Sequence, residues 1–221
     1  KKMAENDPLE YITGCSDFSG LKLLITKDVL IPRSETEILV EKIIQEISLN
    51  KELKGKTFLD IGTGSGAIGL SVKKAFPDLQ VILTDQSEKA LKVARKNAQS
   101  NKLDVIFFLG ELLEPLPIGE RVDFLASNPP YISKKAYQSL EKSVKKEPFQ
   151  ALVGGETGLE VYERLEKECR SYLKKQAKCF FEIGFDQKKS LLNLFSEPFW
   201  KKKEIYNDWS GHPRFFFLEI E

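Results

Sequence analysis

The sequence has few residues of the kinds that bind metals or form disulfides. His212 is its one histidine, and the three cysteines, Cys15, Cys169 and Cys179, are far apart and form no Cys-x-x-Cys motif. This pattern favours neither a zinc site nor a disulfide framework, so we expect no metal, reduced thiols and a cytoplasmic protein. Gly211 and Pro213 flank His212, which favours a turn residue over a catalytic imidazole.

An excess of charge is also lacking, and so are long apolar runs. Lysine and arginine total 34 against 33 for aspartate and glutamate, a net charge of +1. The sequence as a whole therefore gives no electrostatic case for direct nucleic-acid binding. No apolar run approaches the roughly 18 residues of a membrane span, and the amino end has no signal-peptide pattern. We expect no membrane association and a monomer.

Predicted strands and helices alternate over most of the chain. The strands are predicted at 57–61, 81–84, 105–109, 122–127 and 178–183. The helices are predicted at 67–76, 87–100, 158–175 and 187–195. Such alternation indicates an α/β fold with a doubly wound, Rossmann-like and mostly parallel sheet. Two late strands at 202–206 and 214–220, with no helix between them, predict a terminal antiparallel hairpin.

The amino-terminal part predicts a small appendage. A short helix or loop at 8–13 precedes a β-hairpin made by residues 21–25 and 29–31 around the turn Thr26-Lys27-Asp28. Ser34 and Glu37 form a capping-box pattern ahead of a helix at about 35–48. We therefore expect residues 1–33 to be a linker and hairpin appendage, and residues 34–221 to be the main domain.

A glycine-rich loop follows the first strand of the alternating region and opens the next helix. It consists of Gly62, Thr63, Gly64, Ser65 and Gly66. Glycines at such a turn allow the backbone to approach a ligand closely. Asp85 ends the next strand, 19 residues after Gly66, where a carboxylate can accept both hydroxyl protons of an adenosine ribose. Glu111, after the third strand, is a candidate acceptor for an adenine amino group and equally an ordinary solvated acid.

The loop alone is compatible with two adenosine cofactors. Gly64, Gly66 and Gly69 satisfy the dinucleotide fingerprint, and Asp85 has the matching distance. Asp60, just before the loop, is an anion that suits the ammonium group of a methionine better than it suits a pyrophosphate. This favours S-adenosylmethionine over a nicotinamide dinucleotide.

The fourth strand ends in a tetrapeptide that breaks it, Asn128-Pro129-Pro130-Tyr131. Prolines have no N–H, so this lip offers oxygens, together with the aromatic face of Tyr131 and the side-chain carbonyl of Asn128. Such a lip suits a planar group that carries NH2, either a carboxamide or a nucleobase amine. Acceptors around that nitrogen stabilise the positive charge that develops as it is alkylated. The lip therefore predicts an amino-group alkylation site.

With the glycine loop, Asp85 and the lip in this order, the chain resembles the HemK/PrmC family of S-adenosylmethionine-dependent methyltransferases, which modify a glutamine nitrogen (N5) in peptide-chain release factors. The resemblance covers nearly the whole chain from about residue 8. Further segments that look like the family are 8–14, 29–37, 147–159 and 211–214.

The resemblance implies a class I methyltransferase sheet, a release factor as partner and specific roles for the site residues. It implies that Gly62 to Gly66 hold the methionine part of the cofactor, Asp85 its ribose, and Glu111 with Leu112 its adenine. It also implies that Asn128 to Tyr131 hold the substrate glutamine, with Asn128 reaching the cofactor too. The family usually has an aromatic residue in place of Leu112, and a helical docking domain that we expect this chain to lack.

Other functions with the same lip stay open at this point. The substrate could be a glutamine of a ribosomal protein, or adenine N6 in nucleic acid, although an adenine enzyme normally needs a basic groove. A catalytically silent cofactor-binding module is the alternative from another class. A spoiled loop or lip would indicate the silent module, and both are intact.

Overall fold

The computed structural model describes residues 7–221, so the first six residues of the expected appendage lie outside the described residues. A seven-stranded sheet with the order β10-β11-β9-β6-β3-β4-β5 forms the centre of the molecule. Its parallel strands are β3 (Thr57–Ile61), β4 (Gln80–Asp85), β5 (Ile106–Leu109), β6 (Val122–Ser127) and β9 (Leu173–Glu182). The antiparallel strands β10 (Trp200–Asn207) and β11 (Pro213–Ile220) complete one edge. The predicted fold class and terminal hairpin are confirmed.

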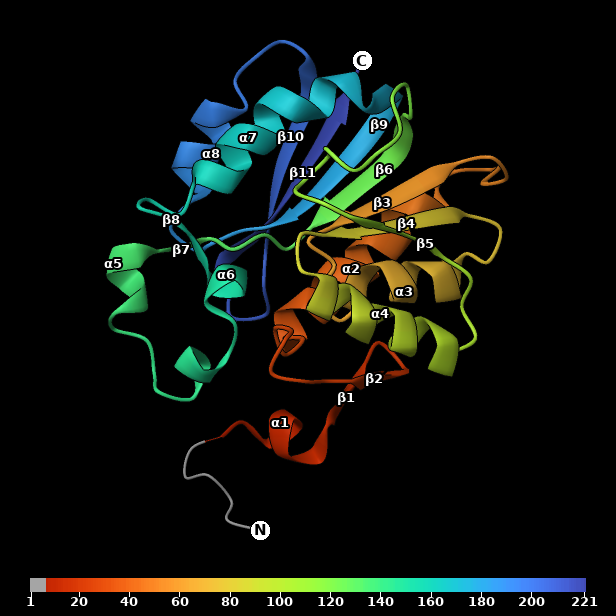
Figure 1. Ribbon diagram of the computed structural model, residues 1–221. Helices are drawn as coiled ribbons and strands as arrows, with labels where there is room; N and C mark the ends of the chain where they lie inside the picture. The colour runs from red at the N-terminus through yellow and green to blue at the C-terminus, as the bar shows by residue number, and fades with distance from the viewer. Residues whose placement is uncertain (1–6) are drawn as a thin grey trace.

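Helices cover both faces of the sheet (Figure 1). One face carries α2 (Ser34–Ser48), α3 (Ala67–Ala75) and α4 (Glu88–Ser100), and the other carries α7 (Glu160–Glu168) and α8 (Lys188–Leu194). Each face has its own hydrophobic cluster, and neighbouring residues of β6 alternate between them: Phe124 packs in one and Leu125 in the other. This is the period-two pattern of a strand that is buried on both sides.

The strand order reverses next to β3. The chain runs outward from β3 through β4 to β5 and then returns to place β6 on the other side of β3. In open α/β sheets, ligands bind at the carboxyl ends of the strands at such a switch point. The glycine loop follows β3 and the lip follows β6, so the topology brings both predicted site segments to this position.

The amino-terminal hairpin is present, and the strand predicted at 21–25 is confirmed as its second strand, but the partner predicted at 29–31 is wrong. After α1 (Leu9–Thr13), β1 (Cys15–Phe18) pairs with β2 (Leu21–Leu24). Val29 and Ile31 are buried in the core cluster without forming a strand, so their apolar pattern reflects burial in a loop. The hairpin is tied to α4 because the N–H of Leu24 donates to Asn97 Oδ1 at 2.6 Å.

The predicted capping box is also wrong. Ser34 is the first residue of α2, so the N-cap position of this helix is occupied by Arg33. No side chain at this position accepts a capping hydrogen bond. Glu37 instead accepts from the backbone N–H of Ser19 at 2.6 Å, which fastens the hairpin turn to α2.

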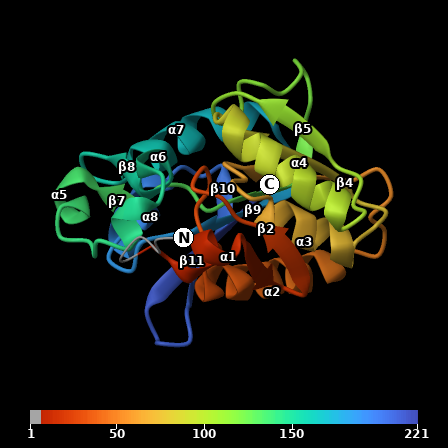
Figure 2. The ribbon, with the colours of Figure 1, turned by 60° about the horizontal axis from the view of Figure 1, so that its bottom comes forward.

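The chain between the lip and α7 forms a compact group at one end of the molecule (Figure 2). It contains β7 (Ile132–Ser133), α5 (Lys134–Tyr137), a 3₁₀ turn (Val144–Lys146), α6 (Phe149–Leu152) and β8 (Val153–Gly155).

The helix that we predicted to reach residue 175 ends at Glu168; a 3₁₀ turn (Cys169–Ser171) follows and β9 begins at Leu173. None of the helices within residues 7–221 is long and apolar enough to cross a membrane.

Candidate active site

The glycine loop joins β3 to α3 at the switch point. Gly62, Gly64 and Gly66 have φ values of 66°, 57° and 88°, a region that favours glycine because it has no Cβ. Gly62 and Gly64 line a cavity of about 170 Å³, whereas Thr63 and Ser65 of the same loop are buried and do not line it. The loop therefore presents backbone, and no large side chain, to the cavity.

Asp85, at the end of β4, holds the loop in place. Its Oδ2 accepts from the N–H of Gly64 at 2.9 Å, and its Oδ1 accepts from the N–H of Ser87 at 2.8 Å. Burial raises the pKa of Asp85 above its ordinary value, although both backbone N–H groups lower it. Each carboxylate oxygen has a second lone pair, so Asp85 can still accept from ribose hydroxyls at the cavity wall.

Asp60 lies beneath the loop and does not line the cavity. Its Oδ2 accepts from the Thr63 hydroxyl and, at 2.9 Å, from the N–H of Gly69. Its Oδ1 is buried without a hydrogen-bond partner among the described residues. Burial raises the pKa of Asp60 to about 7, and the nearby charge of Asp85 adds to this effect. A cation bound near the loop would stabilise the ionised form of both carboxyl groups.

The charged side chains along the cavity are mostly acidic. Over residues 7–221, they are Asp28, Asp85, Glu111 and Arg164. The one cation among them, Arg164, is paired with Glu111 and also lies near Glu114 and Glu168. No lysine or free arginine of the described lining faces the glycine loop, so the cavity suits a cationic cofactor better than a pyrophosphate.

The far end of the cavity contains the predicted adenine-binding residues. Glu111 and Leu112 both line it, and Leu112 has an unusual φ of 48°. Arg164 forms an ion pair with Oε1 of Glu111. We had expected this carboxylate to accept from an adenine amino group, but one of its oxygens already has a partner. Val161 and Arg164, both on α7, complete this end.

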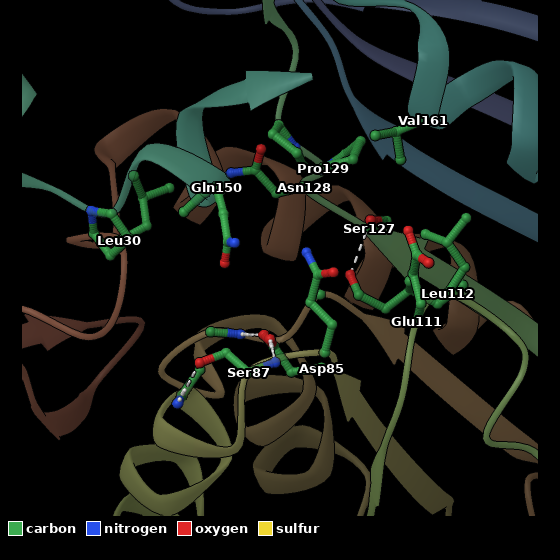
Figure 3. A pocket seen from close by; sticks show the side chains of 18 of the residues that line it. Leu30, Asp85, Ser87, Glu111, Leu112, Ser127, Asn128, Pro129, Gln150 and Val161 are labelled. Carbon is green, nitrogen blue, oxygen red and sulfur yellow. Dashed lines mark hydrogen bonds between the residues drawn. The ribbon is translucent and has the colours of Figure 1, made fainter. Parts of the chain in front are cut away.

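The lip stands opposite Asp85 across the cavity. Figure 3 shows Asn128 and Pro129 on one side and Asp85 with Ser87 on the other. Asn128 donates through Nδ2 to Thr36 Oγ1 at 3.2 Å. The lip also borders a second cavity of about 100 Å³, because Asn128, Pro129 and Pro130 line both. The fourth lip residue, Tyr131, lines the second cavity but not the first.

The backbone of the lip is held by a glycine-rich segment that passes very close to it. A Cβ added to Gly154 would lie 2.1 Å from the carbonyl oxygen of Pro130, and one added to Gly158 would lie 2.3 Å from that of Tyr131. Gln187 Nε2 donates to the Tyr131 carbonyl at 3.1 Å. These contacts explain why glycines occur at both positions: any side chain would displace the lip.

Sequence reasoning missed several residues of the cavity. The segment from Asp28 to Leu30 lines it, although we had predicted a hairpin turn and strand there. Gln150 and Ala151, on α6, line it as well, and Figure 3 shows Gln150 near Asn128. Both segments lie far from the loop in sequence, and their family-like appearance was the one signal that could have pointed to them. Arg33, at the second cavity, is paired with the buried Glu147.

Comparisons with known proteins agree with this geometry. A family profile described as "Methyltransferase small domain" matches residues 34–175. A methyltransferase from Pyrococcus furiosus has a similar fold, with a TM-score of 0.63, 20% identity, and coverage of 91% of this chain and 89% of that one. A 16S rRNA guanine N2 methyltransferase of T. thermophilus, solved with AdoMet and guanosine, has a TM-score of 0.67 and 15% identity over 94% of this chain and 50% of that one.

The fold, the profile and the site together define a methyltransferase. Among its relatives, a release factor glutamine methyltransferase of Chlamydia trachomatis serovar D is 40% identical over 220 residues, covering 99% of this chain and 74% of that protein. One of Enterococcus faecalis is 39% identical over 214 residues, covering 96% of this chain and 76% of that protein. The chain belongs to the release factor glutamine methyltransferase family, as the motifs predicted.

Proposed function

We propose that this protein transfers a methyl group from S-adenosylmethionine to the side-chain amide nitrogen (N5) of a glutamine in a peptide-chain release factor. The observation that carries the proposal is the lip of hydrogen-bond acceptors between two cavities. One cavity, of about 170 Å³, contains the glycine loop and Asp85, and the other, of about 100 Å³, contains Tyr131. Because Asn128, Pro129 and Pro130 line both cavities, a carboxamide in the second cavity would lie against the lip, next to the cofactor cavity.

The residues of the larger cavity fit the proposed cofactor. Gly62 to Gly66 would hold its methionine part, with Asp60 as a buried negative charge beneath the ammonium group. Asp85 would accept from the ribose hydroxyls, and Glu111 with Leu112 would lie against the adenine. Two carboxyl groups whose pKa values are raised by burial, with no ion-pair partner among the described residues, support a cationic ligand. When bound, S-adenosylmethionine would supply an electrophilic methyl group, and its sulfur would keep the electron pair of the broken C–S bond and leave as S-adenosylhomocysteine.

The lip would bind and orient the methyl-accepting nitrogen. The two N–H groups of the glutamine amide would donate to Asn128 Oδ1 and to the backbone carbonyl of Pro129, while Pro130 stiffens the lip and Tyr131 packs on the amide plane. Orientation of this kind contributes roughly 7 to 11 kcal/mol when alignment is good. The nitrogen becomes acidic as it is alkylated, so its proton can leave to water and no strong base is needed.

Further parts of the proposal concern organisation and setting. We propose that residues 1–33 are a linker and hairpin appendage to a methyltransferase domain of residues 34–221. Phe18 and Leu23 of the hairpin share the core cluster with α2 and α3, which supports an appendage fixed to the domain. We also propose a cytoplasmic monomer that acts on protein without contacting nucleic acid. The near-neutral charge and the unpaired cysteines agree with this setting.

The test is a methyl-transfer assay with isotopically labelled S-adenosylmethionine. The protein is incubated separately with a bacterial release factor, with total ribosomal protein and with DNA. The proposal expects label in the release factor alone, and mass spectrometry should place a single methyl group on a glutamine side chain. Replacing that glutamine with alanine should abolish labelling. Label in ribosomal protein or DNA would contradict the proposed substrate, and bound cofactor without transfer to any of them would indicate a silent module.

A further inference from the structure

A chain of buried polar groups lies behind the lip. Glu182 ends β9, the strand next to β6, and only 2% of its surface is exposed. Its Oε2 accepts from the hydroxyl of Thr36, the third residue of α2, at 2.7 Å. Thr36 Oγ1 in turn accepts from Asn128 Nδ2 at 3.2 Å. Three elements that are distant in sequence therefore meet in one hydrogen-bonded chain that ends at the lip.

The ionised form of Glu182 sets the direction of this chain. An ionised carboxylate only accepts hydrogen bonds, so the single proton of the Thr36 hydroxyl must point to Glu182. The Thr36 oxygen then offers only lone pairs to Asn128, and only the NH2 end of the Asn128 amide can face it. The carbonyl end, Oδ1, is turned the other way. Rotation of the amide by half a turn would place two acceptors against each other.

We propose that Glu182 and Thr36 are positioning residues, which set the orientation of the Asn128 amide so that Oδ1 is presented to the methyl-accepting nitrogen. The inference rests on the proposed function, because it assigns a cause to the orientation that methyl transfer needs. Neither residue lines the cofactor cavity; Thr36 lines neither cavity, whereas Glu182 borders the second one, so Thr36 gives the cleaner test of a positioning role. They act through Asn128. Without them, the Asn128 amide could rotate and present its NH2 group to the substrate in place of Oδ1.

Glu182 also reaches the other end of the lip. The Tyr131 hydroxyl donates to Glu182 Oε1 at 3.4 Å, and Arg214 Nη1 donates to the Tyr131 hydroxyl at 3.5 Å. Burial raises the pKa of Tyr131, so its hydroxyl stays protonated and remains a donor. The Tyr162 hydroxyl donates to the Glu182 backbone carbonyl at 2.6 Å, which holds the end of β9 in position.

The charge of Glu182 controls the direction of the chain. Burial raises the pKa of Glu182 to about 7, the Thr36 hydroxyl and the charge of Arg214 oppose this effect, and the charge of Glu35 adds to it. Protonated Glu182 can donate to Thr36, whose hydroxyl can then donate to Asn128 Oδ1 and draw it away from the substrate. Turnover at saturating substrates should therefore decline as the pH falls through about 7.

Paired substitutions test the proposal. Thr36→Val removes the hydroxyl at nearly constant shape, whereas Thr36→Ser keeps it. We expect Thr36→Val and Glu182→Gln to lower kcat on the order of 10- to 100-fold, with the Kd of S-adenosylmethionine within about twofold of wild type. Thr36→Ser should keep most of the activity, and Glu182→Gln should lose the acid limb of the pH profile. Thr57→Val, at the buried amino end of β3, is the matched control and should leave kcat unchanged.

A second measurement needs no turnover. The side-chain NH2 resonances of Asn128, assigned from their loss in Asn128→Ala, should match between wild type and Thr36→Ser and should shift in Thr36→Val. Unchanged resonances in Thr36→Val, or equal kcat for the serine and valine variants in an active enzyme, would overturn the positioning role. If wild type leaves release factors unlabelled, the proposed function fails, and the resonances alone decide whether Thr36 orients Asn128.

Discussion

Replacing Asp85 by asparagine should separate cofactor binding from catalysis. The substitution keeps the size of the side chain but turns one carboxylate oxygen into an NH2 group. Both oxygens are in use: Oδ2 accepts from the N–H of Gly64 and Oδ1 from that of Ser87. In the variant, one of these two backbone N–H groups must face another donor, and one acceptor for the ribose hydroxyls is lost.

The size of the effect follows from these contacts. A hydrogen bond to a charged group contributes about 1.5 to 3 kcal/mol. Loss of one such bond to the ribose predicts cofactor binding weakened on the order of 10- to 150-fold, since about 1.4 kcal/mol corresponds to a factor of ten. The lost bond is made equally before and during methyl transfer, so kcat at saturating cofactor should change by less than about fivefold.

The assay compares Asp85→Asn with Asn128→Ala. Calorimetry gives the Kd of S-adenosylmethionine, and labelled transfer to a release factor gives kcat. Asn128→Ala should lower kcat on the order of 100- to 1,000-fold, because it removes an acceptor for the developing charge, and should leave the Kd within about threefold. Asp104→Asn, an exposed acid outside the cavity, is the control and should change neither value. Equal losses of binding and turnover in both variants would refute the assigned roles.

Three further predictions concern the loop, the lip and the adenine end. Gly154→Ala should lower kcat at least tenfold and spare cofactor binding, because its Cβ would lie 2.1 Å from the Pro130 carbonyl oxygen; wild-type kcat would contradict the close packing. Asp60 has a pKa raised from 3.8 to about 7, so stability falls as the pH rises between these values. Asp60→Asn should therefore raise the Tm of the cofactor-free protein at about pH 8, and raise it by less at about pH 5. The same substitution should weaken cofactor binding. A lowered Tm at about pH 8 would count against this reasoning. Leu112→Phe should tighten cofactor binding by about 0.5 to 1.5 kcal/mol through stacking on adenine, and unchanged calorimetric affinity would argue against adenine at this end.

Much of the fold could be predicted because its signals are local. The alternation of apolar strands and amphipathic helices predicted the sheet, and the glycine loop, Asp85 and the lip all follow predicted strands. Errors arose where burial comes from distant contacts. Val29 and Ile31 look like a strand because they are apolar, yet they are apolar because the loop that contains them packs into the core. The Ser34 pattern failed because α2 begins one residue too early for serine to cap it.

Glu182 shows a second limit of sequence reasoning. It stands in the apolar run from Cys179 to Ile183, where a single carboxylate at the end of a strand resembles an ordinary solvated acid. Its burial, and its bond to a threonine 146 residues earlier, follow from tertiary packing that no local pattern contains. A charged residue inside an otherwise apolar run was the available signal, since such a group is buried only where it has partners.

The positions of the site residues follow from the order of three adjacent strands. In the sheet, Ile61 of β3 lies beside Ser127 of β6, and Ser127 lies beside Phe181 of β9. The next residues along these strands, Gly62, Asn128 and Glu182, therefore emerge side by side at the carboxyl edge. Sequence order separates them by two long crossovers, but parallel pairing in register brings them together. The glycine loop, the lip and the carboxyl group that we propose to orient the lip thus share one rigid frame. A shift in the register of β6 would therefore misplace the lip relative to both the glycine loop and Glu182.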